Sequence, residues 1–119
     1  MTHSPSQIVD YQLAAYNRRD IEDFCRWFSE DVEIFDLPNP RPSFKGKPEM
    51  RELYVGIFAQ SPEVHAEVTK RIAMGRFVID QEIVCGLRGK TIHATAMYEI
   101  ENQLIRRVWF IPAGEGDED

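Results

Sequence analysis

The sequence predicts an α+β fold in which helices fill the hollow of a strongly bent antiparallel sheet. Apolar side chains recur at helical spacing in three segments between residues 7 and 59. Long segments with strand character follow between residues 64 and 111, and turns of two or three residues join them. Helices in the first half and strands in the second half indicate an α+β rather than an alternating α/β architecture.

Two helices are expected at the beginning of the chain. The first covers residues 7–17, with Ser6 as the residue whose side chain caps the free N–H groups. The second follows Asp20, which can act as a cap in the same way, and its apolar face includes Trp27. Both helices therefore present an apolar side to a common core.

A short strand follows, because residues 32–37 alternate between two faces. Val32, Ile34 and Asp36 share the face that should point into the hollow. Three prolines between residues 38 and 42 then predict an irregular loop, since proline lacks the N–H group that a helix or an inner strand needs.

A third helix is expected over residues 48–59, with Tyr54 and Phe58 on its apolar face. Four strands are expected after it, over residues 64–74, 77–87, 91–100 and 103–111. Because their connections are so short, consecutive strands should be antiparallel neighbours in a meander. Glycines near the turns, such as Gly86, would allow the sheet to bend.

Composition limits the protein's class. The 119 residues predict a single domain over the whole chain, 1–119, with an acidic flexible tail at about residues 112–119. A formal net charge of −6 argues against nucleic acid as a partner, since phosphate contacts need clustered basic side chains. No signal peptide and no membrane-spanning apolar segment is recognisable, so we expect a cytoplasmic protein that does not bind membranes.

The two cysteines, Cys25 and Cys85, lie far apart in the sequence. They form no CxxC motif, and no histidine lies near them at ligand spacing. We therefore expect two reduced, mostly buried thiols and no metal site.

An ordered series of short motifs extends over residues 6–111. It comprises Tyr11-x-x-Ala14-Ala15-Tyr16-Asn17-x-x-Asp20, Phe28-x-x-Asp31-Val32, Asp36-x-Pro38, Gly46-x-x-x-Met50-Arg51-x-x-Tyr54 and Asn102-x-Leu104-Ile105-x-x-Val108. In order and spacing, these motifs resemble the SnoaL-like polyketide cyclase and ketosteroid isomerase branch of the nuclear transport factor two-like (NTF2-like) superfamily. The resemblance implies a cone-shaped, cystatin-like α+β barrel around a mostly apolar pocket. It also implies a small hydrophobic molecule as ligand, no cofactor, and a homodimer formed through the outer face of the sheet.

Ketosteroid isomerases combine a carboxylate base with a tyrosine and a protonated aspartic acid that hydrogen-bond the substrate oxygen. The resemblance places the base on Asp36. It places Gln12 at the position of the tyrosine, and the position of the acid falls near Ala96 or Met97, where this chain has no carboxyl group. Asp36 is therefore the catalytic residue that the family pattern supplies.

The alternation around Asp36 supports the same role independently. A carboxylate that points into a hollow beside Val32 and Ile34 has its charged form disfavoured by burial, which suits a general base near neutral pH. The alternative is that Asp36 caps the turn into Pro38 and contacts only backbone.

Other polar candidates lie on the expected strands. Asp80 and Glu82 share one strand face, and Arg71 lies on the preceding strand. A cross-strand ion pair is the simpler interpretation, and a polar lining of a pocket is the alternative. His93 is expected on the outer face of the sheet, and His65 on the surface. The remaining pocket candidates are Gln12, from the resemblance, and large aromatic residues on expected inward faces: Tyr16, Trp27, Tyr54, Phe58, Tyr98 and Trp109.

The leading hypothesis is a small-molecule-binding domain in which Asp36 is the general base for proton transfer next to a carbonyl group. The reaction would be of the steroid isomerase or polyketide cyclase type, with a tyrosine donating a hydrogen bond to the carbonyl oxygen. The competing hypothesis is a non-catalytic ligand-binding or dimerisation module whose pocket is narrow or filled by side chains. An open cavity of about 300 Å³ or more beside Asp36 would favour the first hypothesis.

Overall fold

The computed structural model describes residues 2–114, with side chains described up to residue 111. Its elements follow the order α1 (Pro5–Arg18), α2 (Ile21–Cys25), β1 (Phe28–Asp36), β2 (Pro42–Lys45), α3 (Lys47–Gln60), β3 (His65–Met74), β4 (Phe77–Leu87), β5 (Lys90–Glu101) and β6 (Leu104–Gly114). The three expected helices and the four long strands of the second half are all present.

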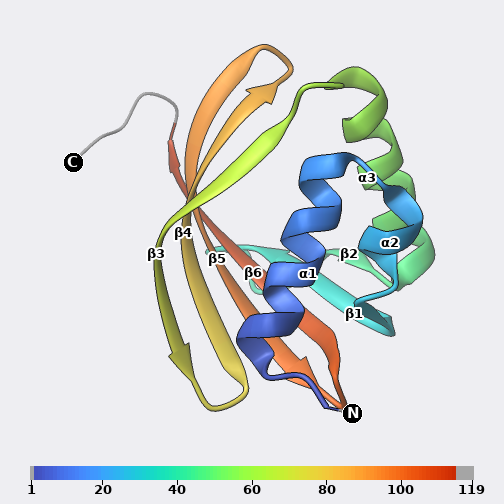
Figure 1. The fold of residues 1–119 in the computed structure, drawn as a ribbon, viewed down its shortest axis with the longest axis vertical. Coiled ribbons are helices and arrows are strands. Elements are labelled where there is room, and N and C mark those ends of the chain that lie inside the picture. The colour runs from blue at the N-terminus through green and yellow to red at the C-terminus, as the bar shows by residue number, and fades with distance from the viewer. Residues whose placement is uncertain (1, 115–119) are drawn as a thin grey trace.

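The strands form one six-stranded sheet in the order β2-β1-β6-β5-β4-β3. Neighbouring strands are antiparallel except β1 and β6, which are parallel. The sheet bends strongly, and the helices lie on its concave side (Figure 1). Within the described residues the edge strands β2 and β3 do not pair with each other, so the cone stays open. The predicted α+β fold, a curved sheet around N-terminal helices, is confirmed.

Helix α1 begins earlier than the apolar pattern indicates. The Ser4 side chain accepts a hydrogen bond from the N–H group of Gln7 (3.2 Å), and the Gln7 side-chain oxygen accepts one from the N–H group of Ser4 (2.8 Å). Pro5 occupies the first turn, where its missing N–H group is not needed. The prediction of Ser6 as the cap was wrong, because this reciprocal capping box forms ahead of Pro5.

The end of α1 is tied to the start of β3. The Asn17 side chain donates a hydrogen bond to the carbonyl oxygen of Ala66 (3.0 Å) and accepts one from its N–H group (2.8 Å). The amide thus satisfies both polar backbone groups of Ala66 on the open side of an edge strand. Asp20 caps α2 through the N–H group of Asp23, as expected. Together these contacts hold the helices over one side of the hollow.

Strand β1 begins at Phe28 and not at residue 32, and α2 ends at Cys25, before Trp27. Strands β2 and β6 also differ from the sequence prediction. Residues Pro42–Lys45 form the short strand β2 on β1, where the prolines had suggested an irregular loop. An edge strand tolerates proline because one side of its backbone needs no partner. Strand β6 continues to Gly114 and pairs with β5 as far as His93, so the predicted tail does not begin at residue 112. The rest of that predicted tail, residues 115–119, lies outside the described residues.

The two cysteines are unpaired, as expected, but only one is buried. Cys25 lies in the core, whereas Cys85 is exposed on the outer face of β4 because it alternates with the inward-facing Val84. Among the described residues, no helix is both long enough and apolar enough to cross a membrane.

Gly86 should be the glycine that the fold tolerates least as alanine. Its φ of +73° disfavours any side chain, and a Cβ there would lie 2.7 Å from the carbonyl oxygen of Glu63. Gly75 is the matched control, because its φ is +59° but nothing lies within 4 Å of its Cβ position. We expect Gly86→Ala to lower the free energy of unfolding by about 2–4 kcal/mol and Gly75→Ala by about 1 kcal/mol. Urea unfolding measures both, and equal losses would show that the contact with Glu63 is unimportant.

Candidate functional site

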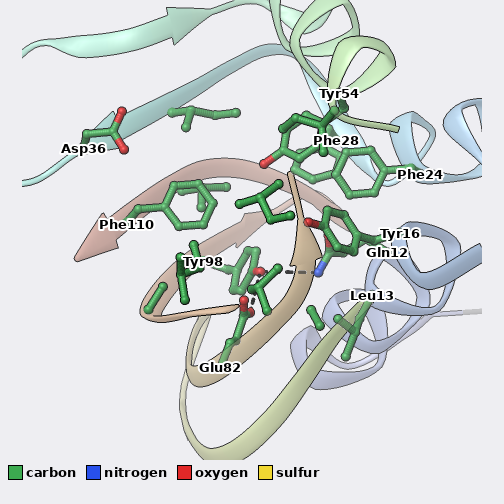
Figure 2. Close-up of a pocket in the computed structure, with 18 residues that line it drawn as sticks. Gln12, Leu13, Tyr16, Phe24, Phe28, Asp36, Tyr54, Glu82, Tyr98 and Phe110 are labelled. Carbon is green, nitrogen blue, oxygen red and sulfur yellow. Dashed lines mark hydrogen bonds between the residues drawn. The ribbon is translucent and has the colours of Figure 1, made fainter. Parts of the chain in front are cut away.

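A cavity of about 290 Å³ lies between the helices and the concave face of the sheet. Figure 2 shows the side chains that surround it. Its polar lining residues are Gln12, Tyr16, Asp36, Tyr54, Glu82 and Tyr98. Its apolar lining residues are Leu13, Phe24, Phe28, Ile34, Ile57, Ala66, Val84, Leu87, Ile92, Ala94, Val108 and Phe110. The volume is at the small end of the range for ligand pockets, and the mixture of an apolar wall with a few polar groups is typical of them.

A buried chain of hydrogen bonds lies on one wall of this cavity. The Tyr98 hydroxyl donates to Glu82 Oε2 (3.3 Å), and Gln12 Nε2 donates to the Tyr98 hydroxyl (3.4 Å). Gln12 Nε2 is itself held by the carbonyl oxygen of Val9 (3.1 Å) within α1. The chain therefore connects α1, β5 and β4, as the dashed lines in Figure 2 show.

The Glu82 carboxyl group faces open cavity space because the residue opposite it, Ala94, has a small side chain. Ala94 lies directly opposite Glu82 on β5, and both residues line the cavity. Glu82 itself is only 7% exposed. The pKa of Glu82 is raised to about 7, first by burial and then by the negative charge of Asp80, while the Tyr98 hydrogen bond and Arg71 act in the opposite direction. Glu82 can therefore gain or lose a proton near neutral pH.

Asp80 lies on the same face of β4 but is compensated by a cation. The Arg71 guanidinium makes two hydrogen bonds to the Asp80 carboxylate, at 2.7 and 2.9 Å, from the neighbouring strand β3. Arg71 also pairs with Asp10 of α1 at 2.9 Å. This bidentate pair serves as a structural clamp between helix and sheet, whereas Glu82, two residues further on, faces the cavity.

Three tyrosine hydroxyl groups complete the polar lining. Burial raises the pKa of Tyr16 to about 12, with a smaller contribution from Glu82. Burial also raises the pKa of Tyr54 and of Tyr98 well above the ordinary value, and the charge of Glu82 adds to both effects. All three hydroxyl groups therefore remain protonated near neutral pH and can donate hydrogen bonds.

Asp36 lies at the end of β1 and lines the cavity together with Ile34, so the face predicted from the alternation is correct. Its side chain is exposed, however, and accepts a hydrogen bond from the Ser43 hydroxyl group of β2 (2.7 Å). The expectation that Asp36 is buried among apolar side chains was wrong, because β1 ends there and the cavity opens to solvent. Asp36 is a carboxylate at the rim, and Glu82 is the one inside.

A family model for the SnoaL-like domain matches residues 9–108. The chain belongs to the SnoaL-like domain family. Membership and fold indicate a ligand-binding or isomerase/cyclase-type domain without assigning a reaction or a catalytic residue. No curated protein matches the chain in sequence.

Solved structures share the fold of this SnoaL-like domain. An uncharacterised cystatin-fold protein from Novosphingobium aromaticivorans superposes with a TM-score of 0.84 at 23% identity, over 92% of this chain and 98% of that chain. A proposed ketosteroid isomerase from Kribbella flavida has a TM-score of 0.78 at 19% identity, over 97% and 81%. An NTF2-like protein of unknown function from Cytophaga hutchinsonii has a TM-score of 0.77 at 16% identity, over 92% and 90%. At these identities the likeness establishes the cystatin-like, NTF2-like fold alone.

Four of the seven sequence-predicted pocket residues of this SnoaL-like domain line the cavity: Gln12, Tyr16, Tyr54 and Tyr98. The other three, Trp27, Phe58 and Trp109, are not among its lining residues. Trp109 stacks on Phe35 at 5.6 Å between ring centroids, on the outer face of the sheet, because it alternates with the lining residues Val108 and Phe110.

The other two displaced aromatics pack elsewhere. Trp27 lies outside the cavity and contacts the rings of Tyr11 and His3, at 4.9 and 5.8 Å between centroids. Phe58 is buried in a satellite cluster and contacts the Tyr16 ring at 5.5 Å. An apolar helical face identifies core positions, but it does not separate the residues that border a cavity from those packed behind them.

Glu82 is a lining residue that the sequence offered only as an alternative interpretation. The alternation placed Asp80 and Glu82 on one strand face, with a cross-strand ion pair as the simpler interpretation and a pocket lining as the alternative. The structure shows one of each, since Asp80 is paired with Arg71 and Glu82 lines the cavity. His93 is on the outer face, opposite Ile83, as expected, and His65 is exposed.

Replacing Glu82 by glutamine should change how stability depends on pH. The pKa of Glu82 rises from 4.5 to about 7 on folding, so the folded state holds this proton more tightly than the unfolded chain does. Its stabilising contribution is complete below about pH 4.5 and is lost as the pH rises to about 7. Relative to wild type, Glu82→Gln should therefore gain about 2–3 kcal/mol of unfolding free energy between pH 5 and pH 8.

Urea unfolding at both pH values measures this change. Glu67→Gln, the same substitution at an exposed position of β3, is the control and should follow wild type. A constant difference between Glu82→Gln and wild type over this range would show that Glu82 does not titrate there.

Proposed function

We propose that this protein binds a small hydrophobic carbonyl compound in its cavity and catalyses proton transfer at the carbon next to the carbonyl group. The reaction is of the isomerase or cyclase type. The observation that carries this proposal is the presence of two carboxyl groups on one apolar cavity, Asp36 at the rim and the buried Glu82 inside. Two carboxyl groups in different environments can divide the roles of base and acid between them.

Asp36 is the general base in this proposal. It is accessible at the rim, and the hydrogen bond from Ser43 fixes the orientation of its carboxylate. It removes the proton from carbon, and the charge that develops on the carbonyl oxygen needs a hydrogen-bond donor. The protonated form of Glu82 can supply that donor, because burial raises its pKa to about 7. Tyr16 and Tyr54 offer two further protonated hydroxyl groups on the same cavity.

The size and the aromatic wall of the cavity support the choice of ligand. A volume of about 290 Å³ accommodates one or two fused rings. The open volume supports a ligand site over a filled hollow, and Trp27, Phe58 and Trp109 are not among the residues that line it. Among the described lining residues there is no lysine, arginine or histidine, which disfavours an anionic ligand. The name of the Kribbella flavida neighbour agrees with this reaction class.

Hydrogen–deuterium exchange of a ketone tests the reaction without knowledge of the natural substrate. We expect the protein to accelerate exchange of the acidic C–H protons of 2-tetralone in D₂O, followed by NMR. Asp36→Asn should lower the protein-dependent rate by about 10²-fold or more, as expected for loss of a general base. The exposed Glu67→Gln should leave the rate unchanged. An Asp36→Asn variant with the wild-type rate would refute the role of Asp36, and no acceleration by wild type would refute this chemistry.

We further propose that two copies associate through the outer face of the sheet. An apolar row crosses five strands there, because Ile72 is opposite Ile79, Ile79 is opposite Met97, Met97 is opposite Trp109, and Trp109 is opposite Phe35. The helices cover only the concave face, so this row has no cover within one described chain. Ile72 is exposed and the other four side chains are partly exposed, and a continuous apolar strip at the surface is typical of an interface between proteins.

Sedimentation equilibrium tests this assembly. Wild type should sediment at twice the chain mass of 13.8 kDa. Met97→Glu places a charge at the centre of the row and should yield a monomer, since burial of an unpaired charge is costly. Ala59→Glu, at an exposed position of α3, is the control and should stay dimeric. A monomeric wild type at micromolar concentration would refute the dimer.

A further inference from the structure

We propose that the cavity also binds an organic ammonium cation, an amine carried on a small apolar group, with its nitrogen at the buried Glu82 carboxylate. This inference rests on the cavity being a ligand site, as in the proposed function, but it does not depend on proton transfer to or from a carbonyl compound.

The first argument is an uncompensated carboxylate. Glu82 is 7% exposed, and among the described residues its carboxyl group receives one side-chain hydrogen bond, from Tyr98, at a long 3.3 Å. No described lysine, arginine or histidine pairs with it, because the nearby Arg71 is engaged by Asp80 and Asp10. A buried carboxylate without a cation is costly, and a bound ammonium group supplies the missing charge and the missing N–H donors.

The second argument is the aromatic wall. Six aromatic side chains line the cavity: Tyr16, Phe24, Phe28, Tyr54, Tyr98 and Phe110. Figure 2 shows that they lie around the same space into which Glu82 points, and that they come from both the helices and the sheet. Aromatic faces attract cations through their quadrupoles, and groups of them are used to bind alkylated ammonium ions.

The third argument is the charge of the cavity and of the whole chain. The ionisable carboxyl groups on the lining are Asp36 and Glu82, and no described lining residue is basic. The chain carries a formal net charge of −6. A field of this sign draws cations toward the cavity and repels anions.

Amine binding must be linked to the titration of Glu82. The groups that face Glu82 are Tyr16 and Gln12 from α1, Tyr54 from α3, Arg71 from β3, Asp80 from β4 and Tyr98 from β5. The tyrosines stay protonated and Arg71 remains paired with Asp80, so Glu82 is the group on this wall that changes charge near neutral pH. A cationic ligand therefore binds more weakly as the pH falls below 7, whereas a carbonyl ligand that accepts a hydrogen bond from protonated Glu82 binds more weakly as the pH rises.

Three ligands with the same ring and different charges test the inference. Benzylamine is a cation, benzyl alcohol is neutral and benzoate is an anion. Isothermal titration calorimetry on the full chain at pH 8 should show benzylamine binding at least about tenfold more tightly than benzyl alcohol, and benzoate most weakly. Lowering the pH to 6 should weaken benzylamine binding by about tenfold, because the ionised fraction of Glu82 falls by about that factor around a pKa of about 7.

Two variants assign the effect to Glu82. Glu82→Gln should bring benzylamine to within about threefold of benzyl alcohol and remove the dependence on pH. Glu67→Gln makes the same chemical change on the exposed side of β3 and should behave as wild type. If Glu82→Gln does not fold, the pH dependence of benzylamine binding to wild type provides the same test.

The outcomes separate this inference from the proposed function. Equal or tighter binding of benzyl alcohol or benzoate at pH 8 would overturn the amine inference, as would benzylamine binding that does not weaken toward pH 6. If 2-tetralone exchanges under catalysis while benzylamine fails to bind, the amine inference fails and the proposed function stands. If benzylamine binds as described and 2-tetralone does not exchange, the cavity is an amine site and the carbonyl chemistry fails.

Discussion

The chemistry of this site depends on one carboxyl group, that of Glu82, which is buried without a paired cation. Asp80 and Glu82 lie two residues apart on the same face of β4, yet Arg71 neutralises the first and leaves the second to the cavity. The two hydrogen bonds from Arg71 compensate Asp80 for its burial, whereas burial without such a partner raises the pKa of Glu82 to about 7. The small Ala94 opposite Glu82 and the chain from Gln12 to Tyr98 determine what space and which donors this carboxyl group meets.

The cavity and the second carboxylate follow from the shape of the sheet. Asp36 lies at the rim of the cavity because β1 ends at that residue, opposite Phe110 of β6, which also lines the cavity. The two hydrogen bonds between the Asn17 side chain and the backbone of Ala66 hold α1 against the edge strand β3, so the helices cover the hollow. One apolar cavity thus has a solvated carboxylate at its rim and a desolvated one within, an arrangement that suits a ligand with a polar group at each end.

Most of the fold could be predicted because periodicity records which side of each element meets the core. The strand pattern located β4 without error, and the alternation around Asp36 placed it on the correct face. The periodicity of apolar residues does not show how far a side chain lies from a cavity. Trp27 and Phe58 were therefore assigned to the pocket although they pack outside it. The assignment of Trp109 to the pocket was wrong for a different reason. Apolar side chains lie on both faces of β6 around Trp109, and on the outer face they continue to Met97 of β5 and Phe35 of β1.

The sequence could not show which of Asp80 and Glu82 pairs with Arg71, because a register shift of one residue decides it. Val68 pairs with Glu82, and a regular ladder would then place Lys70 opposite Asp80. The register shifts between Val68 and Lys70, so Arg71 takes that place and uses its planar fork on both oxygens of Asp80 while reaching Asp10 with its third nitrogen. A lysine there would offer a single flexible ammonium group, which could be shared with Glu82. The Arg71 guanidinium uses its three nitrogens on Asp80 and Asp10. Glu82 is therefore left without a paired cation at the wall of the cavity.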